Sequence, residues 1–181
     1  MIRAALFVLL TALPAGAAPD YGLIRNFTGH GLAFPLQIRT DPGRDMLVTL
    51  RDAETGQPAL TAYLEGGAFF RVLIPAGTFT LDLLAGPQWR DDDPPFGSEG
   101  ERIALDRPLT FRVTGPARKA GHLVDLRGGG EPSVRPIGLC QTYRYDPRDI
   151  DVLRDYYDLP YDDPDRPDIP PGREVRERFC D

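Results

Sequence analysis

Few side chains in this sequence have the types and spacing that catalysis requires. The only serines are Ser98 and Ser133, and neither lies in the Gly-x-Ser-x-Gly turn that exposes a hydrolase nucleophile. His30 and His122 each stand beside glycine in an expected turn, without a recognisable partner for general-base chemistry. The sequence therefore predicts that the protein is not an enzyme. A small hydrolase with an unrecognised site is the catalytic alternative.

Cysteines and acidic clusters are the candidates for metal binding. Cys140 and Cys180 lack the close CxxC spacing of a zinc site, and in an exported protein an even pair predicts a disulfide. The aspartate clusters at 91–93 and 162–165 lack the alternating oxygen ligands of an EF-hand loop, so we expect solvated charges. No metal or cofactor is predicted, and calcium at these acidic loops is left open.

The single tryptophan, Trp89, ends an expected strand and leads into a polar loop. With Arg90, Asp91 and Phe96 it forms a candidate ligand-binding site, because an aromatic face can stack on a sugar ring. A lone aromatic side chain makes a poor binding platform. Packing of Trp89 onto the core is therefore the competing interpretation.

Five tyrosines gather near the C-terminus among arginines, a composition typical of protein interfaces. They are Tyr143, Tyr145, Tyr156, Tyr157 and Tyr161. These side chains are the candidate partner interface. The alternative is that their rings attach the C-terminal segment to the rest of the protein.

The N-terminus has the layout of a secretory signal peptide. Arg3 precedes an apolar run from Ala4 to Leu13, and small residues follow at Ala15-Gly16-Ala17. The run is too short to cross a hydrocarbon core of about 30 Å as a helix, and no later stretch is long enough. We therefore expect cleavage after Ala17, a periplasmic or secreted protein, and no transmembrane segment.

From Pro19 to Arg127, apolar and polar residues alternate in short runs between turn residues, which is typical of antiparallel strands. The expected strands are 46–51, 59–65, 69–74, 78–84, 102–105, 109–113 and 122–126. We expect Pro75-Ala76-Gly77 to join its flanking strands as a hairpin, with 69–74 as a central strand. Their number predicts an all-β fold, an antiparallel two-sheet sandwich of immunoglobulin-like type.

A change in composition after Gly128–Gly130 divides the chain. It predicts a signal peptide at 1–17, a β-sandwich domain at 18–130 and an appendage at 131–181, rich in Pro, Asp, Arg and Tyr and closed by the disulfide.

One short helix is expected in the appendage. Asp146 and Pro147 suit the N-cap and the first helical position, and Ile150, Leu153 and Tyr157 then fall on one face. Because proline and aspartate are dense in the remaining appendage, we expect it to be mostly irregular.

The stretch from Val48 to Trp89 resembles prealbumin-like domains of the carboxypeptidase-regulatory type. More narrowly, it is similar to small uncharacterised exported bacterial β proteins. The motifs are Asp52, Thr55-Gly56-Gln57-Pro58, Gly67 to Val72, Ile74-Pro75-Ala76-Gly77-Thr78-Phe79-Thr80-Leu81, and Ala85-Gly86 before Trp89. The resemblance implies a prealbumin-like sandwich that serves as an accessory or ligand-contacting domain.

The formal net charge of −6, from 21 basic and 27 acidic residues, disfavours nucleic acid as a partner. A β scaffold without reactive groups predicts an exported, non-catalytic binding or structural module that contacts a protein or cell-envelope partner. The alternative is a carbohydrate-binding sandwich that uses Trp89 and the acidic loop after it.

Overall fold

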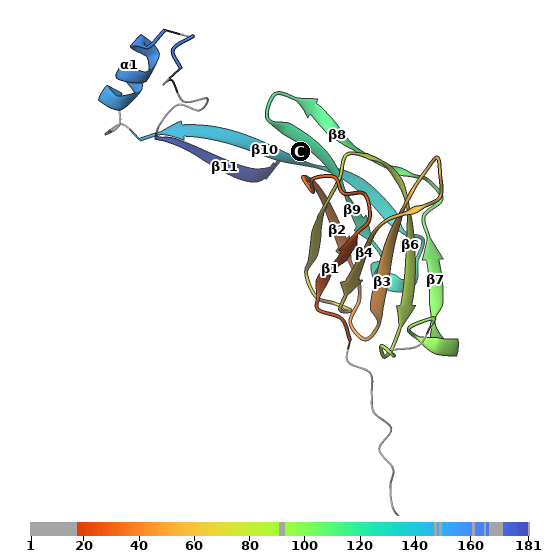
Figure 1. Ribbon diagram of the computed structural model, residues 1–181. Helices are drawn as coiled ribbons and strands as arrows, with labels where there is room; N and C mark the ends of the chain where they lie inside the picture. Colours follow the sequence, from red (N-terminus) through yellow and green to blue (C-terminus); the bar gives the residue numbers. More distant parts are fainter. Residues whose placement is uncertain are drawn as a thin grey trace, which may run out of the picture.

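The computed structural model describes residues 18–90, 93–146, 148, 150–160, 162–164, 166 and 172–180. The expected signal peptide lies outside these residues. The fold is mostly β with one short helix (Figure 1). Its strands are β1 (Gly22–Asn26), β2 (Phe34–Arg39), β3 (Asp45–Asp52), β4 (Pro58–Leu64), β5 (Phe70–Ile74), β6 (Gly77–Gly86), β7 (Glu101–Ala104), β8 (Leu109–Gly115), β9 (Arg118–Asp125), β10 (Ser133–Tyr145) and β11 (Arg173–Cys180). The helix α1 spans Ile150–Asp158.

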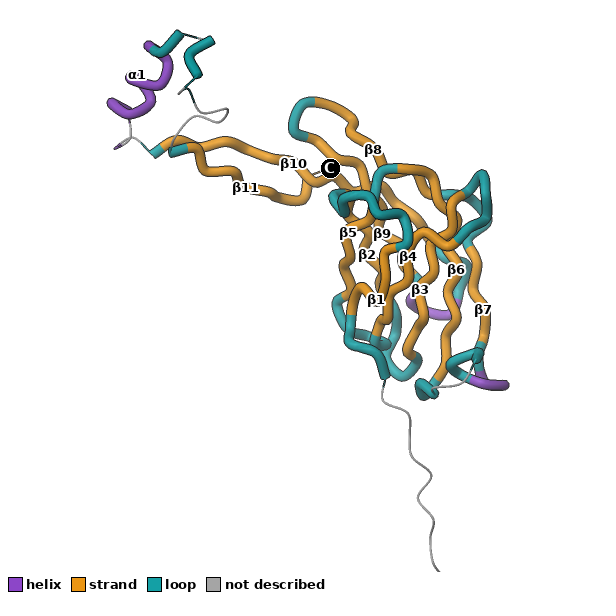
Figure 2. Tube along the Cα trace, viewed as in Figure 1, coloured by secondary structure: helices purple, strands orange, loops and turns teal. Residues whose placement is uncertain are grey.

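The predicted two-sheet sandwich is replaced by one curled sheet that forms a nearly closed barrel (Figure 2). Hydrogen-bonded neighbours run β1-β4-β3-β6-β8-β9-β10-β11. The short strand β8 makes this continuity possible, because its first half pairs with β6 and its second half with β9. Sequence alternation reports which residues face inward, and it does so equally for a sandwich and a barrel.

The expectation of a purely antiparallel sheet is wrong at β2, which pairs in parallel with β9 from Leu36 opposite His122 to Arg39 opposite Asp125. A glycine permits this approach: a Cβ on Gly121 would lie 2.0 Å from the Pro35 carbonyl oxygen. Five successive residues of β2 are buried, so it shows none of the alternation that marks a strand with one wet face.

The predicted hairpin at Pro75-Ala76-Gly77 does not form. β5 pairs antiparallel with β2, whereas β6 pairs with β3, so the turn carries the chain from one side of the barrel to the other. Nor is β5 a central strand, because β2 is its one hydrogen-bonded neighbour among the described residues. At the seam between β5 and β1, the Tyr21 hydroxyl donates to the Phe69 carbonyl.

The predicted alternation is confirmed in β3, β5 and β6, whereas β4 is buried on both faces and β7 has no buried residue. In β3, Met46, Val48 and Leu50 are buried while the residues between them are half-buried, and β4 pairs with it as expected. The turn between these strands is fixed by the Asp52 carboxylate, which accepts hydrogen bonds from the Thr55 amide and hydroxyl; these bonds lower the pKa of Asp52.

The core fills the barrel with aliphatic and aromatic side chains from every strand that lines it. Its buried members are Phe34, Leu36, Ile38, Met46, Val48, Leu50, Ala59, Leu60, Ala62, Leu64, Phe70, Val72, Ile74, Phe79, Leu81, Leu83, Ala85, Leu109, Phe111 and Val124. The barrel is therefore a packed scaffold rather than an open channel.

The segment predicted to be a mostly irregular appendage contains two long strands. β10 pairs with β9 from Ser133 to Cys140 and with β11 from Gly138 to Tyr145, so beyond Cys140 it leaves the barrel as a two-stranded ribbon. Together with α1 this ribbon forms an arm that projects from the barrel (Figures 1 and 2).

Candidate functional site

The arm, comprising the described residues from Gly138 to Cys180, is the candidate functional site. Its ribbon pairs β10 with β11 from Gly138 opposite Cys180 to Tyr145 opposite Arg173. Within the described residues, β11 has no other strand beside it. Side chains on the outer ribbon are therefore presented to solvent and available to a partner.

A disulfide closes the base of the arm. Cys140 is bonded to Cys180 with their Cα atoms 5.9 Å apart, as the sequence predicts. The adjacent Gly138 lets the strands meet here, since a Cβ on it would lie 2.7 Å from the Cys180 carbonyl oxygen. The bridge therefore holds the end of β11 where the ribbon leaves the barrel.

One face of the ribbon carries an apolar strip, defined as the cross-strand pairs Leu139–Phe179 and Tyr143–Val175 with the polar pair Gln141–Glu177 between them. Phe179, Tyr143 and Val175 remain 40%, 46% and 49% exposed. In the polar pair, the Gln141 side-chain amide donates to Glu177 at 2.7 Å. Exposed apolar side chains on a projecting element are typical of an interaction surface.

At the barrel end, the strip meets a cavity of about 350 Å³. Pro35, Leu73, Leu139 and Phe179 supply its apolar wall. The Arg71 guanidinium lies 5.4 Å from the centre of the Phe179 ring, which connects β11 to β5 through a cation–π contact.

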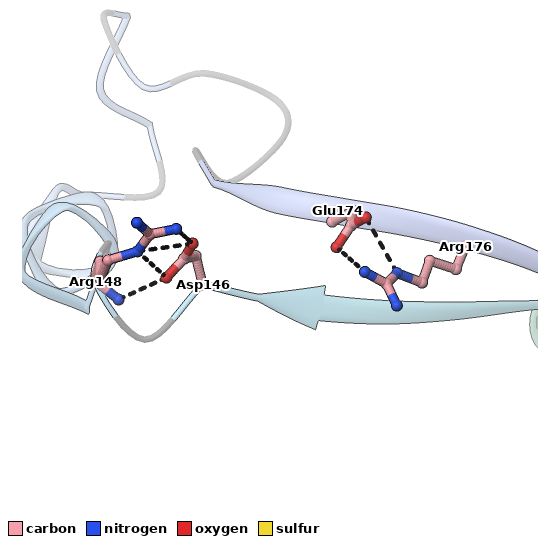
Figure 3. A network of polar contacts seen from close by, with 4 residues as sticks. All are labelled: Asp146, Arg148, Glu174 and Arg176. Atoms are coloured by element: carbon pink, nitrogen blue, oxygen red, sulfur yellow. Dashed lines mark hydrogen bonds and ion pairs between the residues drawn. The ribbon is translucent and has the colours of Figure 1, made fainter.

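The opposite face of the ribbon is charged. Glu174, Arg176 and Arg178 occupy every second position of β11 and so share this face. Arg176 binds Glu174 through two side-chain hydrogen bonds (Figure 3). Beyond β10, Arg148 binds the Asp146 carboxylate in the same way, and these bonds lower the pKa of Asp146. The two faces of the ribbon thus differ in character.

The predicted interface tyrosines are brought to the arm but serve different roles. Tyr156 is buried at the end of the arm, with the Arg166 guanidinium 4.7 Å from its ring centre and Tyr157 edge-to-face against it. Tyr157 is 60% exposed. Tyr161 and the Tyr145 side chain lie outside the described residues. The structure thus offers Tyr143 and Tyr157 to a partner.

The residues predicted around Trp89 are used mainly for packing. The Trp89 ring lies edge-to-face between Tyr63 and Phe96, with ring centres 5.4 and 5.6 Å away. Phe96 is 1% exposed. Arg90 turns to Glu99 at 3.0 Å, and Asp91 lies outside the described residues.

Beside this cluster, buried Tyr63 and half-buried Asp45 form a polar pair. The Tyr63 hydroxyl donates to Asp45 at 2.5 Å, and Asp45 also accepts from the Gly66 amide. Burial, followed by the hydrogen bond to Asp45, raises the pKa of Tyr63 above its usual value. The pair ties β3 to the chain after β4, a positioning role that sequence spacing did not signal.

His122 is also engaged inside the fold. Its Nε2 lies 2.9 Å from the Thr110 carbonyl oxygen, and its ring is edge-to-face with Phe111. Burial lowers the pKa of His122, and the nearby Arg107 acts in the same direction. Over the part of the chain that the structure describes, no three His, Cys, Asp or Glu side chains are placed to share a metal ion.

A second hollow, of about 620 Å³, opens between β7 and the turn after β9. Met46, Ala85 and Ile103 line it, and three of its charged side chains are already engaged: Arg44 binds Glu101 at 2.6 Å and Asp41 accepts from the Gly128 amide. Fewer charged groups are therefore available to a ligand in this hollow than its residue composition suggests.

Comparisons with protein families, with curated proteins and with solved structures found no match for this chain. The likeness to prealbumin-like domains thus stays a prediction that rests on the residues from Val48 to Trp89. Among the residues described here, no helix has the length and apolar character needed to cross a bilayer.

Proposed function

We propose that the protein is an exported, non-catalytic binding module and that its arm contacts a protein partner in the cell envelope or outside the cell. One observation carries the proposal: a disulfide-tied ribbon and helix project from a packed barrel while presenting exposed apolar side chains. Soluble proteins rarely expose apolar side chains in contiguous patches without a binding role.

Three exposed side chains of the helix support the same role. Ile150, Val152 and Tyr157 are all exposed on α1. Tyr156 is the one residue of this helix that is buried among those described. A nine-residue helix is too short to be stable by itself in water, so contacts with another surface would strengthen it.

Export supports the proposal from a different direction. The bonded Cys140–Cys180 pair fits an oxidising compartment, and the N-terminal sequence fits a cleaved signal peptide. Two titratable side chains of the barrel strands have structural roles, since His122 binds a backbone carbonyl and Tyr63 binds Asp45.

The test is capture with the full mature chain, followed by affinity measurement with the purified partner. Tyr157→Asp should weaken that affinity about tenfold or more, because it places a charge at the exposed end of the arm. Leu23→Asp is the matched control: it makes the same kind of change at an exposed apolar residue of β1, on the barrel.

Equal effects of the two variants would remove the arm from the binding site. Turnover of a substrate by the purified chain would remove the non-catalytic assignment.

A further inference from the structure

The apolar strip is arranged symmetrically about its own midpoint. Gln141 and Glu177 form the central pair, and the Leu139–Phe179 and Tyr143–Val175 pairs lie two positions to either side of it. At a strand rise of ~3.4 Å per residue, each apolar pair is about 7 Å from the centre. A twofold rotation about this midpoint would place each apolar pair over the other.

The two ends of the strip also differ in shape in a complementary way. At the barrel end, Leu139 and Phe179 border the cavity of about 350 Å³ together with Pro35 and Leu73. At the outer end, Tyr143 and Val175 stand on a ribbon with no strand beyond it among the described residues. The strip thus has an exposed apolar pair at one end and an apolar cavity four residues away at the other.

The central charges suit the same arrangement. Lys119, the only lysine of the sequence, lies 3.6 Å from the Glu177 carboxylate, and Gln141 donates to that carboxylate. Each copy would therefore bring one base and one acid to a twofold axis, where each Lys119 can also reach the other copy's Glu177. Two unpaired carboxylates facing each other would oppose association, whereas this pairing supports it.

We infer that the apolar strip binds a second copy of this chain in an isologous dimer, with Tyr143 and Val175 of each copy over the Phe179 cavity of the other. This is the self-complementary contact that a twofold interface requires. The inference rests on the proposed role of the arm as a binding element, and it names the occupant of one ribbon face. It leaves the charged face and α1 to other partners.

The first test is the mass of the oxidised mature chain in solution across ~1 to 100 µM, by sedimentation or light scattering. The wild type should be dimeric at the upper end of this range. Val175→Arg should weaken dimerisation about tenfold or more, because it puts a second guanidinium beside that of Arg71 at the partner's Phe179 cavity. Thr142→Arg lies on the opposite face of the same ribbon and should leave the dimer intact.

The second test fixes the register. A mixture of copies with normal and heavy nitrogen is treated with a carbodiimide, which joins amines directly to nearby carboxylates. Lys119 should link to Glu177 in peptides that carry one light and one heavy half, the signature of a bond between copies. A linkage confined to unmixed peptides contradicts the proposed twofold axis.

A wild-type chain that stays monomeric, or a dimer that resists Val175→Arg as it resists Thr142→Arg, overturns the inference. These outcomes are separate from failure of the proposed function. If Tyr157→Asp still loses the envelope partner while the chain is monomeric, the arm binds another protein and only the second copy is excluded.

Discussion

Trp89 lies between the rings of Tyr63 and Phe96. Tryptophan is often found in ligand-binding sites, but here it packs against its aromatic neighbours. Phe96 packs so closely on Gly86 that a Cβ there would lie 2.4 Å from the ring. The aromatic cluster therefore packs outside the barrel core, against β4 and the end of β6. Its side chains contribute to stability through burial and edge-to-face contacts.

Trp89→Ala should lower the free energy of unfolding by about 3 kcal/mol, because it removes the central ring of this cluster. Urea denaturation measures the loss. Arg90→Ala is the control, since its ion pair with Glu99 is exposed, and it should change stability by less than about 0.5 kcal/mol. Loss of glycan binding in Trp89→Ala with unchanged stability would instead favour the carbohydrate-binding alternative.

His122 should make the protein less stable in mild acid. Its pKa is lowered in the folded state, so the unfolded chain binds the proton more readily, and folding stability falls as pH drops below the unfolded value of about 6.5. Unfolding followed between pH 7 and pH 5 should show this slope, and His122→Gln should flatten it. An unchanged slope in the variant would assign the acid sensitivity to other groups.

At the scale of elements, the sequence predicts the strands in which apolar and polar residues alternate. It does not predict β2 or the two strands of the arm, which lack that pattern. Met46, Val48 and Leu50 identify β3 because each inward residue is followed by a more polar one. β2 gave no such signal, since Phe34, Leu36 and Ile38 are interleaved with buried Pro35 and Gln37.

The arm was missed for a different reason. Proline, glycine and arginine interrupt the apolar pattern along β10, and charges alternate along β11, so neither segment resembles a core strand. Their pairing follows a register that composition does not encode, although the Cys140–Cys180 bond joins their base. The candidate tyrosines could therefore be identified from the sequence, but not the ribbon face that presents Tyr143.

Gly121→Ala tests the contact between β2 and β9. A Cβ would clash with the Pro35 carbonyl oxygen, so the strands must separate, and stability should fall by about 2 kcal/mol or more. Gly115→Ala, with no atom within 4 Å of the added Cβ, is the matched control and should be close to neutral. Thermal denaturation distinguishes them, and equal melting temperatures would show that β2 adapts.

Replacing both cysteines by serine should loosen the arm and spare the barrel. The bridge spans 40 residues, and on the chain-entropy model it supplies about 4 kcal/mol. Because β11 pairs with β10 alone among the described residues, its amides should exchange with solvent about tenfold faster or more in the variant. Amides of β3 and β6 should keep their protection; a barrel that loses protection equally would show that the two parts fold together.

The whole molecule divides its tasks between a packed barrel and a projecting arm (Figure 1). The barrel holds nearly all the buried apolar side chains, whereas the large apolar side chains of the arm, on β10, β11 and α1, are mostly exposed. This division is typical of a scaffold that positions a binding element at a distance from its own surface.

Export is the prediction that belongs to this scale. When the full sequence is expressed with its N-terminal segment in a bacterium that has a periplasm, the protein recovered from that compartment should begin at Ala18. Intact-mass spectrometry reads the new terminus, and Ala17→Leu should block processing because the cleavage site needs a small residue there. An uncleaved chain that stays in the cytoplasm would contradict the expected localisation.

The parallel contact between β2 and β9 also sets an order of events during synthesis. Leu36 cannot meet His122 until the intervening chain has been made, so the apolar segment 34–38 leaves the ribosome long before its partner exists. A nascent chain that must wait in this way remains thin enough to thread through a membrane pore. It also exposes the apolar segment 34–38, which a chaperone would have to cover until the chain has been exported.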